Sequence, residues 1–196
     1  MKIHNFHSPL FTFIVQYQYT MDSLRLPLQF NASLIRQEIA QFTKADYQDI
    51  YNPSVTLETL WLMHLIVPIG CPTEGVKFVP NDALKQCPYL LSVFETFQCS
   101  VETFRIHTLD AGAHIQPHRD TGYSFEMGKV RLHIPIQTNP KVEILLNGNP
   151  VMMEEGECWY CNFDIIHEVT NHSDEGRVHL ILDCMVNDWL TDLFHS

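Results

Sequence analysis

The pattern of apolar and polar positions changes character near residue 100. Before that point, an apolar stripe at helical spacing runs along 33–42, and Asn31 precedes it as a suitable N-cap. Pro88 suits the first turn of a second helix, which carries apolar side chains over 90–97. The apolar run 60–68 lies between these two segments and predicts a strand.

After residue 100, short segments with a period of two alternate with turn signals. Asn147-Gly148 is a strong hairpin-turn dipeptide, Glu155-Gly156 marks another turn, and 171–176 reads as a loop. The predicted strands are Val101–Leu109, 130–137, Val142–Leu146, 151–153, 158–162, 167–170 and 177–186. Many short strands at this spacing favour a sandwich or barrel.

The pattern therefore predicts an α+β, mainly β chain, with N-terminal helices that buttress a jelly-roll core. We expect one domain over 1–196, with a helical part at 21–99, the jelly-roll core at 100–186 and a C-terminal tail at 187–196. Residues 1–20 read either as a disordered leader or as an edge strand.

Composition and charge exclude several classes of protein. A hydrophobic fraction of 45% is typical of a globular chain, and 12 basic against 23 acidic residues give a net charge of −11, which disfavours nucleic-acid binding. The apolar run 10–15 is too short to span a membrane, and no secretory signal is recognisable. Six cysteines are too few for a disulfide scaffold in a chain of 196 residues. We expect a cytoplasmic protein that does not associate with membranes. The sequence leaves open whether it forms a homodimer.

His118 and Asp120 are two residues apart, so on an extended backbone both side chains project from the same face. His167 lies near the start of a later predicted strand. Two histidines and one carboxylate form the facial set of ligands found in non-haem Fe(II) oxygenases. A His-x-Asp triplet alone is weak evidence, since a surface turn explains it equally well.

Arg177, ten residues after His167, heads the next predicted strand. A guanidinium there can bind the distal carboxylate of a 2-oxo acid through two parallel hydrogen bonds. The competing interpretation is a surface arginine that pairs with an aspartate.

The C-terminal half resembles the aspartyl/asparaginyl β-hydroxylase family, including its small bacterial proline hydroxylases. The matching segments, in the family's order and spacing, are Pro117-His118-Arg119-Asp120, 130–136, 155–160, His167 and 177–183. The resemblance implies a double-stranded β-helix that uses Fe(II), 2-oxoglutarate and O2. In the family's animal branch the carboxylate ligand is absent, so the presence of Asp120 favours the bacterial amino-acid hydroxylases.

Arg131 and His133 share one face of their predicted strand, and Arg177 and His179 repeat the Arg-x-His pattern on a later one. Two such faces beside a metal motif favour a polar cavity over a solvated surface. By resemblance, Arg131 and His133 contact the metal-side carboxylate of the co-substrate or the substrate itself, and His179 is a candidate substrate residue.

His107 resembles a family position near the distal carboxylate of the co-substrate. Arg105 lies on the same side of its strand and is a candidate for binding a substrate carboxylate. Cys158 and Cys161 have CxxC spacing, but residues three apart on a strand face opposite sides, which argues against a redox or zinc site.

The sequence thus predicts a 2-oxoglutarate-dependent dioxygenase that hydroxylates an aliphatic C–H bond of an amino acid or amino-acid residue, with succinate and CO2 as co-products. One alternative keeps the cofactors but takes a peptide or a specialised metabolite. Another is a non-enzymatic, cupin-like metal-binding module.

Overall fold

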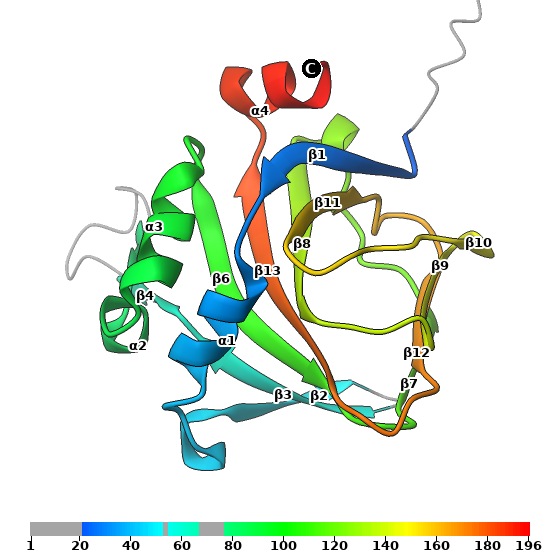
Figure 1. Cartoon of the computed structure of the whole chain (residues 1–196). Coiled ribbons are helices and arrows are strands. Elements are labelled where there is room, and N and C mark those ends of the chain that lie inside the picture. The colour runs from blue at the N-terminus through cyan, green and yellow to red at the C-terminus, as the bar shows by residue number, and fades with distance from the viewer. Residues whose placement is uncertain (1–20, 53–54, 67–76) are drawn as a thin grey trace, which may run out of the picture.

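The computed structural model describes residues 21–52, 55–66 and 77–196 (Figure 1). The expectation for 1–20, and the end of the predicted strand 60–68, lie outside these segments. Within the described residues, no helix is long and apolar enough to cross a membrane.

Two antiparallel sheets form the jelly-roll, so the predicted mainly β fold is confirmed (Figure 1). The larger sheet has the strand order β1 (Ser23–Gln29), β11 (Glu157–Cys161), β8 (Lys129–Gln137), β13 (Arg177–Met185), β6 (Val101–Leu109), β3 (Val55–Trp61) and β2 (Gln48–Asn52). The smaller sheet has the order β10 (Asn149–Pro150), β9 (Val142–Leu146), β12 (His167–Asn171) and β7 (His114–His118). A separate pair joins β4 (Met63–Ile66) to β5 (Lys77–Pro80).

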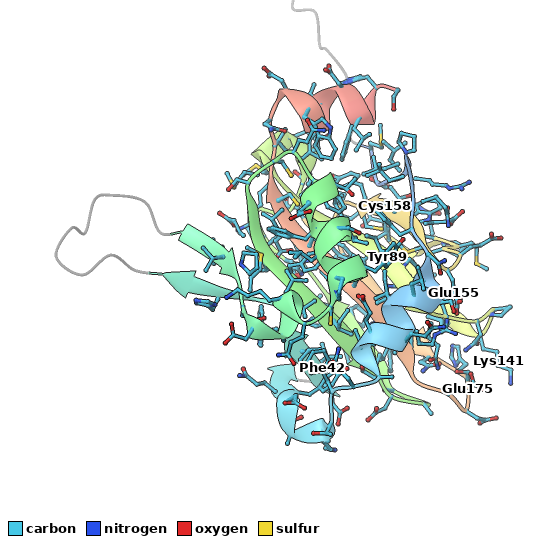
Figure 2. All side chains as sticks on the ribbon, turned by 60° about the vertical axis from the view of Figure 1, so that its left-hand side comes forward. Phe42, Tyr89, Lys141, Glu155, Cys158 and Glu175 are labelled. Carbon is cyan, nitrogen blue, oxygen red and sulfur yellow. The ribbon has the colours of Figure 1, made fainter. Side chains whose placement is uncertain are left out.

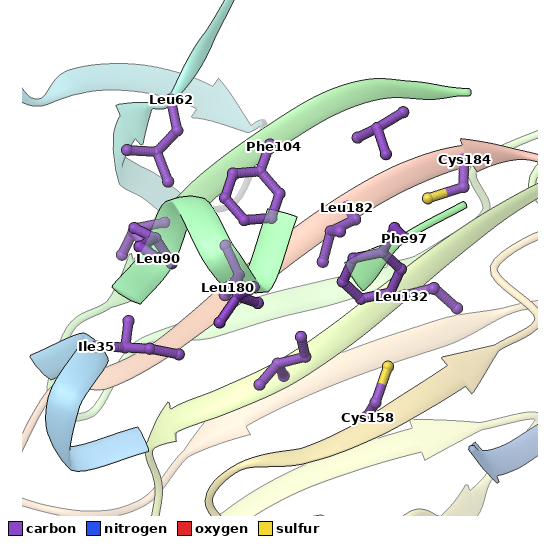
Figure 3. Packing of buried hydrophobic residues seen from close by; sticks show 14 of the residues in the cluster. Ile35, Leu62, Leu90, Phe97, Phe104, Leu132, Cys158, Leu180, Leu182 and Cys184 are labelled. Atoms are coloured by element: carbon purple, nitrogen blue, oxygen red, sulfur yellow. The ribbon is translucent and has the colours of Figure 1, made fainter. Parts of the chain in front are cut away.

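Helices cover the outer face of the larger sheet. The α-helices are α1 (Ala32–Ile39), α2 (Asp82–Lys85), α3 (Pro88–Thr96) and α4 (Asp188–Phe194), and two short 3-10 turns lie at Lys44–Asp46 and Phe125–Met127. Ile35 of α1 and Leu90 of α3 pack with Leu180 and Phe104 of the sheet in one apolar core (Figure 3). Burial of these side chains is the main stabilising contribution to this layer.

α1 and α3 are fastened to each other by polar contacts. The Glu38 carboxylate accepts the backbone N–H groups of Tyr89 and Leu90 at 2.7 and 2.8 Å, which caps the first turn of α3. The backbone N–H of Asn31 donates to the Tyr89 hydroxyl at 2.7 Å, so the two helices lie side by side over the sheet (Figure 2).

Alternation along the central strands separates two environments. On β6, Phe104 and Ile106 enter the core under the helices, while Arg105 and His107 lie on the opposite, inner face. β8 and β13 follow the same rule, and cross-strand pairing aligns His107 with His179. The inner face is therefore polar, and it faces the smaller sheet.

The helix starts were predicted correctly. Asn31 caps α1, accepting the backbone N–H of Leu34 at 3.1 Å, and Pro88 occupies the first turn of α3. The segment 21–99 is not mainly helical, however, because it also contributes β1 to β5. Likewise, the expected tail 187–196 contains α4, whose Leu190 is fully buried.

One of the strands that the sequence did not predict contains a proline. Pro27 is at an exposed position of β1, between Leu26 and Leu28, and its missing N–H is tolerated because β1 is an edge strand with a register shift between Leu26 and Gln29. The run 60–68 also divides, since Leu62 separates β3 from β4.

The Asn147-Gly148 turn joins β9 to β10, with both residues at positive φ (47° and 78°), as a type I′ hairpin requires. The second strand of this hairpin is only Asn149–Pro150, so the prediction of a strand at 151–153 was wrong. Beyond it, Val151 still donates its backbone N–H to the Ile144 carbonyl at 2.9 Å, although 151–153 is not a strand.

Candidate metal centre

His118, Asp120 and His167 converge where β7 ends and β12 begins. Cross-strand pairing places His167 directly opposite His118, and their ring centroids are 4.2 Å apart. Nε2 of His118 is 3.8 Å from Oδ1 of Asp120. Metal-ligating atoms from the three residues all lie within 4.8 Å of one another, so one ion could bind them together.

Both histidines present the correct nitrogen for a metal. Nδ1 of His118 lies 2.8 Å from the Gln116 carbonyl, and Nδ1 of His167 lies 3.0 Å from the Ile165 carbonyl. Since a carbonyl oxygen only accepts, each Nδ1 carries the proton and each Nε2 keeps a free lone pair. Burial also lowers the pKa of His167, which favours the neutral ring that a metal requires.

Asp120 is held from two sides although it lies beyond the end of β7. Its backbone N–H donates to the Phe163 carbonyl at 2.9 Å, and its own carbonyl accepts the Tyr123 N–H at 3.2 Å. Nη1 of Arg131 donates to Oδ2 of the carboxylate. Oδ1 is thereby left on the side of His118 as the free metal-binding oxygen.

A cavity of about 170 Å³ opens beside these three residues, between the two sheets. The predicted residues Arg177, Arg131, His133 and His107 all line it. Its remaining walls are mainly apolar, formed by Leu57, Ile115, Ile144, Phe163, Val169 and Ile181. The sequence-predicted metal and co-substrate residues therefore meet at one cavity.

Arg177 is buried, and no described acidic residue pairs with it. Its side chain lies at the first position of β13 and is only 3% exposed. Within the described segments, no hydrogen bond or ion pair holds this guanidinium, and its Nε is unsatisfied. Burial lowers the pKa of Arg177 to about 10, so it is still charged at neutral pH. A buried, unpaired cation facing a cavity indicates a site for an anion.

Three histidines also belong to the inner face. His107 and His133 line the cavity, whereas His179 is fully buried behind it and borders a second, largely apolar cavity of about 310 Å³. The Nδ1 atoms of His133 and His179 share a hydrogen bond at 3.2 Å. His179, a candidate substrate residue from the sequence, thus does not line the cavity with the metal ligands.

Arg105 is also placed away from the cavity lining. It is buried, and its Nη1 donates to Oδ2 of Asp183 at 3.0 Å, while its Nε donates to Nε2 of His107 at 3.2 Å. The sequence interpretation of Arg105 as a ligand for a substrate carboxylate did not anticipate Asp183, which supplies a carboxylate from within the chain.

Sequence reasoning assigned no role to three residues that shape the site. Asp183 binds both Arg105 and Arg131, Tyr123 stacks on Arg131 at 4.2 Å, and Phe163 forms a wall of the cavity. Asp183 carried a usable signal, because it is a charged residue within the otherwise apolar run 180–185 and so needs a buried partner.

The CxxC segment has no role in this site. Cys158 packs in the core under the helices, whereas Cys161 packs on the inner side with Phe163. Both thiols are free, and burial raises the pKa of each well above its ordinary value. The prediction that the two sulfurs diverge is therefore confirmed.

A model of the aspartyl/asparaginyl β-hydroxylase family matches residues 29–186. The chain belongs to this family. It is a 2-oxoglutarate-dependent hydroxylase whose cofactors are Fe(II), 2-oxoglutarate and O2. This membership disfavours the alternative of a non-enzymatic metal-binding module.

Solved structures support the fold. An oxidoreductase of the 2OG-Fe(II) oxygenase family from Burkholderia pseudomallei superposes with a TM-score of 0.53 and 12% identity, covering 85% of this chain and 86% of that one. SnoN, a non-haem α-ketoglutarate-dependent epimerase from nogalamycin biosynthesis, superposes with a TM-score of 0.52 and 10% identity, covering 84% and 78%. The hydroxylase thus has the double-stranded β-helix that the resemblance implied.

We predict that acid destabilises this hydroxylase through its inner-face histidines. Burial is the largest cause that lowers the pKa of each, to about 2 for His107 and well below 6.5 for His133 and His179. Between these values and 6.5 the unfolded chain binds more protons than the folded one, so stability is lost as the pH falls below 6.5. Each histidine contributes a slope of about 1.4 kcal/mol per pH unit.

Thermal unfolding of the metal-free protein at pH 7.5, 6.0 and 5.0 measures this effect. His179→Leu should show a shallower decline than the native protein, and the exposed His64→Ala should show the native one. An unfolding temperature that is constant or rises towards pH 5.0 would contradict the prediction.

Proposed function

We propose that this hydroxylase inserts oxygen into an aliphatic C–H bond of an amino acid or an amino-acid residue, with succinate and CO2 as co-products. The observation that carries the proposal is the unpaired Arg177 guanidinium in the same cavity as His118, Asp120 and His167. A cation and a metal site facing one small cavity suit a molecule with a carboxylate at each end. 2-Oxoglutarate has that form.

In this proposal, Nε2 of His118, Oδ1 of Asp120 and Nε2 of His167 hold Fe(II). When bound, iron and 2-oxoglutarate supply the oxidising chemistry, in which one oxygen atom of O2 enters the substrate and the other enters succinate. Arg177 binds the distal carboxylate, and the apolar walls of the cavity exclude water from it. His107 and His133, as neutral hydrogen-bonding groups, orient the co-substrate between its two ends.

The substrate reaches the metal from the side that the co-substrate leaves open. His118 and Asp120 are about a third exposed at this edge (33% and 28% of their side chains), whereas Arg177 lies deep in the fold. An exposed metal edge suits either a free amino acid or a residue of a peptide, and a specialised metabolite is the remaining alternative. The expectations of a cytoplasmic location and of a homodimer stay predictions.

Metal and co-substrate binding provide the first test. Anaerobic addition of Fe(II) and 2-oxoglutarate together should give a weak visible charge-transfer band, which neither gives alone. His167→Ala should lose the band, because two protein ligands hold Fe(II) poorly. Absence of the band in the native protein would refute the proposed site.

Arg177→Met tests the role of the buried cation. We expect the 2-oxoglutarate requirement, meaning the concentration needed for half-maximal turnover, to rise by about 10- to 100-fold, because a charge-assisted pair is lost. Metal binding should persist. The metal-free variant should unfold at the same or a higher temperature, because an uncompensated buried charge has been removed.

The matched control is Arg25→Met, which removes an exposed arginine paired with Glu157 at the edge strand β1. It should leave the 2-oxoglutarate requirement unchanged. If Arg177→Met kept native kinetics, another cation would hold the distal carboxylate. If it instead lowered the unfolding temperature sharply, Arg177 would be a structural residue.

Succinate formation against a panel of free amino acids and short peptides tests the substrate class. Turnover of 2-oxoglutarate should rise above its substrate-free rate with at least one member, and mass spectrometry should show a matching gain of one oxygen atom. Stimulation by peptides alone would exclude the free amino acids, and no stimulation by either class would refute the proposed substrate.

A further inference from the structure

A continuous set of charged contacts runs from the proposed metal site into the larger sheet. Arg131 binds Oδ2 of Asp120 through Nη1, and it binds Asp183 through Nε at 2.6 Å and Nη2 at 3.3 Å. Oδ2 of Asp183 also accepts hydrogen bonds from the Thr103 hydroxyl at 2.8 Å and from Nη1 of Arg105 at 3.0 Å. Arg105 donates to Thr103 as well.

Strand pairing fixes the backbone of this set. Asp183 of β13 lies between two cross-strand neighbours, Thr103 of β6 on one side and Arg131 of β8 on the other. All three strands are in the interior of the sheet, with a strand on either side of each. The side chains therefore meet by register and need no loop to bring them together.

Burial makes the contacts strong. The Asp183 side chain is only 2% exposed and that of Arg105 only 5%. Burial by itself raises the pKa of Asp183, but Arg105 and Arg131 outweigh it and hold the pKa well below its ordinary range. Removing one member of such a set leaves an uncompensated buried charge.

An aromatic ring contacts the remaining face of Arg131. The Tyr123 ring stacks against its guanidinium at 4.2 Å, and the Tyr123 N–H donates to the Asp120 carbonyl. Asp183 binds the Nε and Nη2 edge of the guanidinium, so Nη1 is directed at Asp120. The direction of that single bond decides which carboxylate oxygen of Asp120 remains for the metal.

We propose that Asp183 is a positioning residue, which orients Arg131 so that Asp120 keeps Oδ1 free for the metal. This inference rests on the proposed function, because it takes Asp120 as a ligand. In it Arg105 supports Asp183 from behind, instead of binding a substrate carboxylate. Neither Asp183 nor Arg105 lines the cavity, so neither touches the reacting groups.

The test compares Co(II) binding by the metal-free full-length chain in native and Asp183→Asn forms, by calorimetry and by absorption at saturating metal. We expect the affinity to fall by about 10- to 100-fold, as is typical when a residue behind a metal ligand is removed. The visible Co(II) spectrum at saturation should also change, because Asp120 would bind with different geometry. A purely structural role would lower the unfolding temperature but leave this spectrum as it is.

Glu102→Gln is the matched control. It removes a carboxylate from the same strand as Thr103 and breaks an ion pair with Lys129, which also stacks on Tyr123. Co(II) affinity and spectrum should stay native in this variant. An equal loss in Glu102→Gln, or native affinity and spectrum in Asp183→Asn, would overturn the proposal.

Thr103→Val provides a second test of the proposal if Asp183→Asn does not fold. It removes one donor to Asp183 without changing a charge, and it should weaken Co(II) binding by about 3-fold, while Thr103→Ser should restore it. Native affinity and spectrum in both Thr103 variants would overturn the positioning role. Absence of Co(II) binding by the native protein would instead refute the metal site itself, so the two failures are distinguishable.

Discussion

Alternation of side chains along β6, β8 and β13 is the constraint on which the rest of the structure depends. Both faces of these strands are buried, so each residue enters one of two very different interiors. Leu180 and Leu182 pack under the helices (Figure 3), while His179 and Asp183 alternate with them and lie on the inner face. A slip by one residue would place arginines in the apolar core and leucines in the cavity, so the fold and the site specify each other.

Among the residues that the structure describes, the charged side chains of the inner face are paired with one exception. Arg105 and Arg131 are neutralised by Asp183 and Asp120, and these pairs are satisfied by hydrogen bonds as well as by charge. Arg177, in contrast, is buried with no acidic partner among the described residues. Leaving a cation in this state costs stability in the free protein, which is expected of a group reserved for a ligand.

The sequence was sufficient for the parts of the site that depend on short-range pattern. His118 and Asp120 were identifiable from their spacing, and Arg177 from its distance after His167. These residues lie close together because β12 pairs with β7, and that pairing cannot be read from a local sequence pattern. Asp120 was expected to share a strand face with His118, yet it lies past the end of β7 and is placed by backbone hydrogen bonds to Phe163 and Tyr123.

The partners of the charged residues were beyond sequence reasoning for a related reason. Asp183 is 52 residues from Arg131 and 78 from Arg105, and only the strand order β8-β13-β6 brings them together. Because the sequence does not show that order, Arg105 was interpreted as a ligand for a substrate carboxylate. Strand β1 was missed because the proline in it resembles a strand breaker. An edge position, which makes the proline tolerable, is a property of the sheet and not of the segment.

The charge balance also explains why metal and co-substrate suit this cavity as a pair. On the inner face, the described residues include three arginines against two carboxylates, which leaves one positive charge in the free protein. A divalent metal alone would add two more positive charges beside Arg131, whereas a dicarboxylate alone would bring two negative charges into a fold whose net charge is already −11. In the proposed complex the two additions would cancel, with one carboxylate at the metal and the other at Arg177. In the positioning role that we propose, the pair Asp183–Arg131 then holds the protein's own carboxylate, Asp120, in the geometry that the metal needs.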